Sequence, residues 1–272
     1  MKKIFLHIGI GKTATSAIQK VCYESISDDS NTKYFPFGLI GDVHNSLSDF
    51  HPNFKEDIFD EAICQFKNLD SSYNYLISSE FLAYASKDLI NTLIKAIINA
   101  GFQPEVILVI RSFSDLLLSS YLQALKSGFG LHKGESIIDY AERVQKDLNY
   151  LDLLDKWGQC TAKIIDFDLN KKNIINVFLN ELEINVKSNI ELSRGVNLSL
   201  MCEFIPLIRQ FDSRTPEASS EDRKEFIQRL LDFSKDYYYL SDNRFHKQCI
   251  EKISDEMERL QYPKLKQKYN FI

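Results

Sequence analysis

A short polar segment near the start of the chain has the residue types needed to hold an anionic group. Residues 7–19, HIGIGKTATSAIQ, follow the apolar residues KIFL. Main-chain N–H groups at residues 11–16 would be unpaired at the start of a helix, and they would carry the positive end of its dipole. The side chains add one full positive charge and three hydroxyl donors, from Lys12, Thr13, Thr15 and Ser16. The segment therefore predicts a phosphate-binding loop that opens at Gly11.

This loop differs from the loop that binds nucleoside triphosphates. When Gly11, Lys12 and Thr13 are aligned with the pattern G-x-x-x-x-G-K-[ST], the first glycine falls at position 6, which is Leu6. A shorter loop encloses one phosphate group rather than a polyphosphate chain. The residues therefore favour a single phosphate as the bound group.

A second candidate phosphate site follows another apolar run. Residues 105–110, EVILVI, end at Arg111, and the residues after it have helical spacing. An arginine at the carboxyl end of a strand can direct two N–H donors onto a phosphate. Ser119, two helical turns further on, faces the same side and can donate another hydrogen bond. Two separate single-phosphate sites fit a ligand that carries charge at both ends.

Both segments resemble those of sulfotransferases, especially bacterial ones, that use 3′-phosphoadenosine 5′-phosphosulfate. The family's first loop has the pattern H-I-G-x-x-K-T-G-T-T-x-x-Q, and its second element is a buried strand ending in Arg, then a helix with Ser eight residues later. This chain departs from the pattern at Ala14, where the family has glycine. A positive φ at that position would strain an alanine.

The resemblance implies transfer of a sulfuryl group from 3′-phosphoadenosine 5′-phosphosulfate, as co-substrate, to a hydroxyl acceptor that is a saccharide or another small metabolite. It implies that Lys12 stabilises the leaving 5′-phosphate, and that no metal is needed because a lysine can replace magnesium when the transferred group carries less charge. The residues implied to bind the co-substrate are Gly11, Lys12, Thr13, Ala14, Thr15, Ser16, Arg111 and Ser119.

Two residues are candidates for the base that accepts the acceptor's proton. Glu80 ends the predicted strand YNYLISSE, and ISSEFL resembles the segment of bacterial and glycan sulfotransferases in which the Glu serves as base. His44, in GDVHNSL, has an ordinary pKa of about 6.5 and lies in the region where the family contacts its acceptor. Burial would raise the pKa of Glu80 and Lys12 would lower it. We favour Glu80 and keep His44 as the alternative.

Two other functions fit parts of the same pattern. A small phosphate-loop kinase would need magnesium and a strand-end aspartate to hold it, whereas the strand at 105–110 ends in Arg111. A non-catalytic binding module would keep the nucleotide pocket without turnover, and Ala14 is the residue that motivates this alternative.

Alternating short apolar runs and longer helical patterns predict the elements that position these residues. Strands are expected over 3–8, 73–80, 105–110 and 162–167, with residues 30–52 as a loop region and only helices after about residue 198. This order predicts a three-layer, P-loop NTPase-like α/β fold with a central parallel sheet flanked by helices. We expect a single domain over 1–272, with an α/β core at 1–197 and a helical portion at 198–272.

Net charge, cysteine content and the length of apolar segments limit the kinds of partner and location that the chain can have. The formal net charge of −5 over 272 residues gives no general attraction to nucleic acid. The five cysteines are widely spaced and without a C-x-x-C pair, so we expect reduced core residues and no metal site. The chain has no long apolar segment, which predicts a cytoplasmic protein without a transmembrane helix. The sequence leaves the oligomeric state and the acceptor's identity open.

Overall fold

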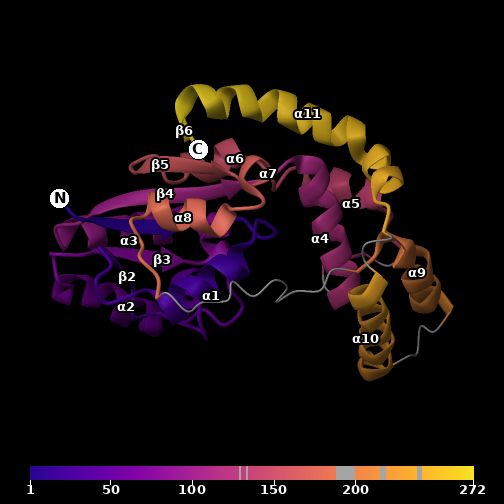
Figure 1. Cartoon of the computed structure of the whole chain (residues 1–272), viewed down its shortest axis with the longest axis horizontal. Helices are drawn as coiled ribbons and strands as arrows, with labels where there is room; N and C mark the ends of the chain where they lie inside the picture. Colours follow the sequence, from indigo (N-terminus) through magenta and orange to yellow (C-terminus); the bar gives the residue numbers. More distant parts are fainter. Residues whose placement is uncertain (129, 133, 188–199, 215–218, 238–240) are drawn as a thin grey trace. The chain divides into compact units, whose positions relative to one another are not determined.

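The computed structural model describes the chain except for residues 129, 133, 188–199, 215–218 and 238–240. The described residues form one sheet of six strands, and each neighbouring pair is parallel (Figure 1). In their order across the sheet the strands are β2 (Thr32–Tyr34), β3 (Asn74–Ser78), β1 (Lys3–His7), β4 (Gln103–Ile110), β5 (Thr161–Asp166) and β6 (Asn270–Phe271).

Four of these strands were predicted from their apolar runs. The predictions over 3–8, 73–80, 105–110 and 162–167 are confirmed as β1, β3, β4 and β5. In β4, every residue from 104 to 110 is buried. A strand with helices over both faces has such a continuous apolar sequence instead of an alternating one.

The two outer strands were not predicted. β2 lies inside the region 30–52, which the sequence predicts as a loop, and β6 lies at the end of the chain. Within the described residues each pairs with one neighbour, β2 with β3 and β6 with β5. Three and two residues are too few to show a periodic pattern of apolar side chains.

Helices flank the sheet. On one face, α1 (Thr15–Ser25) and α8 (Ile174–Glu181) pack against the strands (Figure 1), and their buried cluster includes Phe5, Ile18, Leu76, Ile107, Val109 and Phe178. Alternate strand residues such as Leu6 and Leu108 are fully buried on the opposite face. There α3 (Lys87–Asn99), which contacts β4, supplies a buried stripe of leucine and isoleucine. The predicted three-layer α/β fold is confirmed.

The chain divides into two compact units. The first comprises residues 1–111, 150–194 and 263–272, and the second comprises 112–149 and 195–262. Besides the elements above, the first contains η1 (Asn45–Leu47), α2 (Glu56–Cys64), η2 (Gln65–Asn68), η3 (Glu80–Tyr84), α6 (Tyr150–Asp155) and α7 (Phe167–Asn170). The predicted single domain stays a prediction, and its expected internal boundary at 197/198 lies outside the described residues.

The second unit is helical where it is described. It contains α4 (Phe113–Ser127), α5 (Ile137–Val144), η4 (Cys202–Phe204), α9 (Ile205–Arg214), α10 (Ser220–Tyr237) and residues 244–262 of α11 (Arg244–Lys268). The sequence predicts only helices after about residue 198, and α9, α10 and α11 lie in that region. Within α11 the boundary between the units falls at Pro263, whose ring removes a main-chain N–H donor from the helix.

The structure bears on two predictions made from composition, one about the cysteines and one about transmembrane helices. The prediction that all five cysteines are core residues is wrong, because Cys64 is exposed and Cys160 and Cys249 are only partly buried. Cys22 and Cys202 are buried, and all five are free thiols. Every helix in the described ranges is too short or too polar to cross a bilayer.

Candidate functional site

The strand order explains why distant residues meet at one edge of the sheet. β1 lies between β3 and β4, so the residues that follow these three strands share the carboxyl edge. In open α/β sheets, ligands bind at the carboxyl ends of the strands, at the point where the strand order reverses. The loop after β1 occupies this position, with Glu80 after β3 and Arg111 after β4.

Two glycines let the loop pass close to Glu80. Gly9 has a φ of 102°, and a Cβ added there would lie 3.0 Å from the Cα of Glu80. A Cβ added at Gly11 would lie 3.1 Å from Oε2 of the same glutamate. At Gly9 the positive φ and the closeness of the Glu80 main chain disfavour any larger residue, whereas at Gly11 the Glu80 carboxyl would have to shift by a few tenths of an ångström. The predicted loop and the predicted base are therefore in direct contact.

The loop itself adopts a conformation suited to an anion. Lys12 and Ala14 have φ values of 71° and 63°, whereas Thr13 between them does not have a positive φ. This alternation turns successive main-chain N–H groups toward one side, as in the anion-binding concavities called nests. In the part of the chain that the structure describes, the N–H groups of residues 13–16 donate to no acceptor. Four donors at the start of α1 are therefore available to a ligand.

Two of the three loop hydroxyls bond to the main chain of the loop itself, and the third is exposed. Oγ1 of Thr13 donates to the carbonyl of Ile10 at 2.6 Å, and Oγ1 of Thr15 donates to the same carbonyl at 3.1 Å. Both side chains are buried. A hydroxyl has one proton, so these two stabilise the loop and are not, in this arrangement, the phosphate donors that the sequence predicts. Ser16 is exposed, so its hydroxyl can reach a ligand.

Glu80 combines partial burial with a neighbouring positive charge. It begins η3, and Ser79 caps this turn by accepting a hydrogen bond from the N–H of Phe81 at 3.2 Å. Burial raises the pKa of Glu80, and the charge of Lys12 opposes that rise. The sequence could not say which effect dominates; burial does, and the carboxyl holds a proton at a higher pH than an ordinary glutamate.

Arg111 contacts the loop after β1 and residues of two other elements. Its Nη1 donates to the carbonyl of Lys12 at 2.9 Å, and its guanidinium carbon lies 5.1 Å from the centre of the Phe167 ring. The hydroxyl of Tyr150 donates to the Arg111 carbonyl at 3.0 Å. A guanidinium presents five N–H donors in a planar fork, a geometry that suits an anionic ligand.

Phe167 and Tyr150 were not predicted as part of the site. Phe167 directly follows β5, the neighbour of β4, so the rule that parallel strands end at one edge applies to it as well. A phenylalanine at a strand end has no charge or hydrogen-bonding group, so its residue type does not indicate a place in a binding site. Tyr150 begins α6, and no sequence pattern indicates that its hydroxyl meets Arg111.

His44 lies in a buried position that occupies both of its ring nitrogens. Nε2 donates to the carbonyl of Phe35 at 2.7 Å, and Nδ1 accepts the N–H of Ser78 at 3.0 Å. Burial lowers the pKa of His44 to about 4. With both nitrogens bonded to the main chain, the imidazole has no lone pair available for an acceptor proton. Glu80 stays the predicted base.

Two further residues that match the loop pattern are also buried. His7 forms a hydrogen bond of 2.7 Å between Nδ1 and the hydroxyl of Ser78, and burial lowers its pKa to about 3. Gln19 is 4% exposed on α1. Both side chains are therefore shielded from solvent.

Ser119 lies on α4 in the second compact unit. Arg111 belongs to the first unit. The joint binding of a phosphate by Ser119 and Arg111 therefore stays a prediction. Among the described residues, no group of three or more His, Cys, Asp or Glu side chains has the arrangement of a metal site.

Comparison with known proteins finds distant similarity to solved structures. No family model matches the chain, and no curated protein matches it. Among solved structures, the chain is similar to a sulfotransferase from Alicyclobacillus acidocaldarius, with 12% identity and a TM-score of 0.45, over 71% of this chain and 87% of that one. A similarity at this level is too distant to establish a family or an activity.

Proposed function

We propose that the chain transfers a sulfuryl group from 3′-phosphoadenosine 5′-phosphosulfate to a hydroxyl acceptor. The observation that carries this proposal is the meeting of three features at one strand edge: the available N–H groups of residues 13–16, the Lys12 side chain on the same loop, and the Glu80 carboxyl against Gly11. The first two suit an anionic leaving group, and the third suits a proton acceptor. The sequence resemblance to sulfotransferases supports the choice of the sulfuryl group.

In the proposed step, the acceptor's hydroxyl oxygen attacks sulfur and a new S–O bond forms. The bond between sulfur and the oxygen of the 5′-phosphate breaks, and adenosine 3′,5′-bisphosphate leaves. The hydroxyl proton passes to a carboxylate oxygen of Glu80, and Lys12 with the loop N–H groups stabilises the charge that develops on the leaving oxygen. Arg111, which follows β4, is proposed to hold the 3′-phosphate through its guanidinium group.

A group of aromatic residues next to Glu80 supports a saccharide as acceptor. Phe81 follows Glu80 directly, and its ring lies 6.3 Å from that of Phe50 and 4.8 Å from that of His51, between centroids. Phe50 is 57% exposed. Exposed aromatic rings supply flat apolar surface on which the apolar face of a sugar ring can stack. We propose a saccharide, or a small metabolite with a similar ring, as the acceptor class.

Transfer of radiolabelled sulfate from the donor to a panel of glycans and small alcohols tests the proposal. Lys12→Ala should reduce the transfer rate by about 10²–10³-fold, as does loss of one charge-stabilising donor in other enzymes. Lys20→Ala, on α1 beyond the loop, is the matched control and should leave the rate unchanged. Equal labelling by wild type and Lys12→Ala would refute the role of Lys12.

Binding measurements separate the proposal from its alternatives. Calorimetry with adenosine 3′,5′-bisphosphate should show binding that Lys12→Ala weakens. Binding of the bisphosphate with no transfer to any acceptor would favour the non-catalytic module. Tight binding of magnesium–ATP with none of the bisphosphate would favour the kinase.

A further inference from the structure

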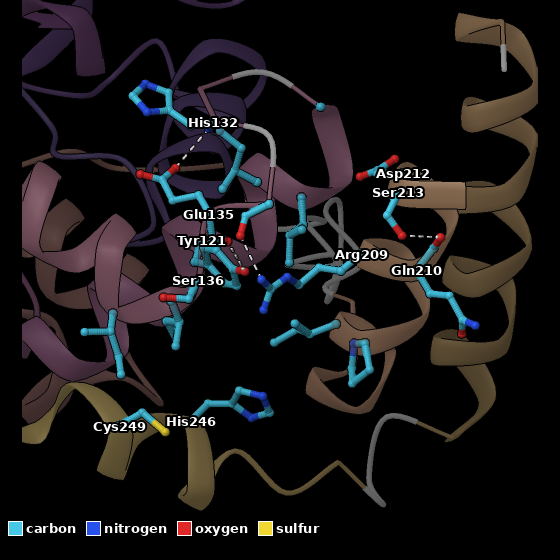
Figure 2. A pocket seen from close by; sticks show the side chains of 18 of the residues that line it. Tyr121, His132, Glu135, Ser136, Arg209, Gln210, Asp212, Ser213, His246 and Cys249 are labelled. Atoms are coloured by element: carbon cyan, nitrogen blue, oxygen red, sulfur yellow. Dashed lines mark hydrogen bonds between the residues drawn. The ribbon is translucent and has the colours of Figure 1, made fainter. Parts of the chain in front are cut away.

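A cavity of about 1020 Å³ lies in the second compact unit (Figure 2). Its lining comes from α4, the loop before α5, α5 itself, α9, the start of α10 and the start of α11. The volume is at the upper end of the range of pockets that bind small molecules. None of the described lining residues belongs to the loop site after β1. The cavity is therefore a separate feature of the molecule.

One part of the cavity wall is apolar. Leu125, Ile137 and Ile205 are 3%, 8% and 5% exposed and line it from three different helices. Phe245 lines it too and is 68% exposed. Apolar side chains that face an open cavity gain free energy when an apolar group displaces water from them. The wall fits the apolar body of a ligand.

The acidic residues of the wall are already paired. Glu135 accepts two hydrogen bonds from Arg143, at 2.7 and 2.8 Å. Asp212 accepts two from Arg223, at 2.8 and 3.2 Å. A carboxylate in a bidentate pair with arginine has its charge compensated. These residues therefore do not attract a cation into the cavity.

Arg209 adds a positive charge without a comparable partner. Its Nη2 donates to the carbonyl of Gly134 at 2.8 Å, and no carboxylate of the described chain lies within ion-pair distance of it. Figure 2 shows its side chain pointing toward the loop that carries Glu135. His246, on another part of the wall, has a buried Nδ1 atom with no hydrogen-bond partner among the described residues. Both groups can bind an anionic oxygen.

We propose that this cavity binds a small amphipathic carboxylate. The apolar body lies against Leu125, Ile137 and Ile205, and the carboxylate accepts hydrogen bonds from Arg209, with His246 as a second polar contact. Charge complementarity decides the sign of the head group. The acidic wall residues are in bidentate pairs with arginine, whereas Arg209 interacts with a carboxylate, that of Asp139, only at a distance longer than that of an ion pair. The inference stands independently of the proposed sulfuryl transfer, because every residue that it uses lies in the second unit.

Calorimetry with decanoate tests the proposal on the intact protein, with decanol and decylamine as ligands of equal chain length. Decanoate should bind at least tenfold more tightly than either. Arg209→Gln should abolish that preference, whereas Arg229→Gln, which removes an exposed arginine of α10 outside the cavity, should retain it. Because Arg209 is exposed, its substitution should leave the fold intact. Equal affinity for decanoate and decanol, or an unchanged preference in Arg209→Gln, would overturn the proposal.

The rate at which Cys249 is alkylated can show whether decanoate binds in the cavity. Its thiol lines the cavity beside His246 (Figure 2), whereas Cys64 is exposed in the first unit. Alkylation followed by peptide mass spectrometry should show that decanoate slows the modification of Cys249 and leaves that of Cys64 unchanged. Binding without protection of Cys249 would place decanoate elsewhere and overturn the assignment. Lys12→Ala should bind decanoate normally, so failure of the sulfuryl-transfer proposal is distinguishable from failure of this one.

Discussion

The left-handed conformation of Ala14 makes the stability effect of Ala14→Gly calculable. At a φ of 63°, an alanine is strained by about 1–2 kcal/mol relative to its ordinary conformations. Glycine relieves this strain but loses about 0.5–1 kcal/mol more conformational entropy on folding. The Ala14 methyl also packs partly against the core cluster, and its removal costs less than the roughly 0.8 kcal/mol of a fully buried methylene. These effects nearly cancel, so we expect the free energy of unfolding to change by less than about 0.5 kcal/mol.

The same substitution in a right-handed helix should behave differently. Ala96 lies inside α3, and Ala96→Gly should lower the free energy of unfolding by about 1 kcal/mol. Glu183, an exposed residue with a φ of 53° after α8, provides the opposite control, because Glu183→Gly relieves strain without removing a buried group. Urea denaturation of the three variants beside wild type gives the comparison. If Ala14→Gly destabilises as much as Ala96→Gly, the left-handed assignment and the strain argument are both refuted.

Two more predictions concern titratable groups near the loop. His44 should make the protein acid-sensitive: its pKa falls from 6.5 to about 4 on folding, so the unfolded chain binds its proton first and stability is lost as pH drops through that window, by about 3 kcal/mol in total. Urea denaturation across this range should show a slope that His44→Gln reduces by about 1.4 kcal/mol per pH unit, and equal slopes would contradict the burial argument. For Glu80, adenosine 3′,5′-bisphosphate at the loop should raise its already elevated pKa further, so binding at mildly acidic pH should take up a proton. Calorimetry in two buffers of different ionisation enthalpy should detect the uptake in wild type and not in Glu80→Gln; uptake in both would assign the proton to another group.

Much of the fold was predictable because it depends on apolar side chains. The buried runs of β1, β3, β4 and β5 are long enough to stand out from the polar segments around them. β2 has the sequence Thr-Lys-Tyr and β6 has Asn-Phe, and both join the sheet through main-chain hydrogen bonds to one neighbour. Main-chain pairing leaves little trace in residue type, so edge strands this short escape prediction.

In the candidate site, too, the features that depend on residue type were predictable and those that depend on main-chain contacts were not. The proximity of Glu80 and Arg111 to the loop follows from parallel strands ending at one edge, and the sequence could predict it. The bonds of Thr13 and Thr15 to the Ile10 carbonyl, and those of His44 to Phe35 and Ser78, end on main-chain groups. Every residue carries such groups, so no pattern of residue types can identify which one a side chain will meet.

The contact between Glu80 and the loop also links the two halves of the proposed chemistry. Lys12 is the charge that opposes the rise in the pKa of Glu80, and it is also the proposed partner of the leaving phosphate. When an anionic ligand occupies the loop, it shares the charge of Lys12 and leaves the carboxylate less stabilised. A less stabilised carboxylate is a stronger base, since its pKa lies closer to that of the group it must deprotonate. Because Gly9 and Gly11 allow Glu80 to approach the loop, binding of the proposed donor would strengthen Glu80 as the proposed base.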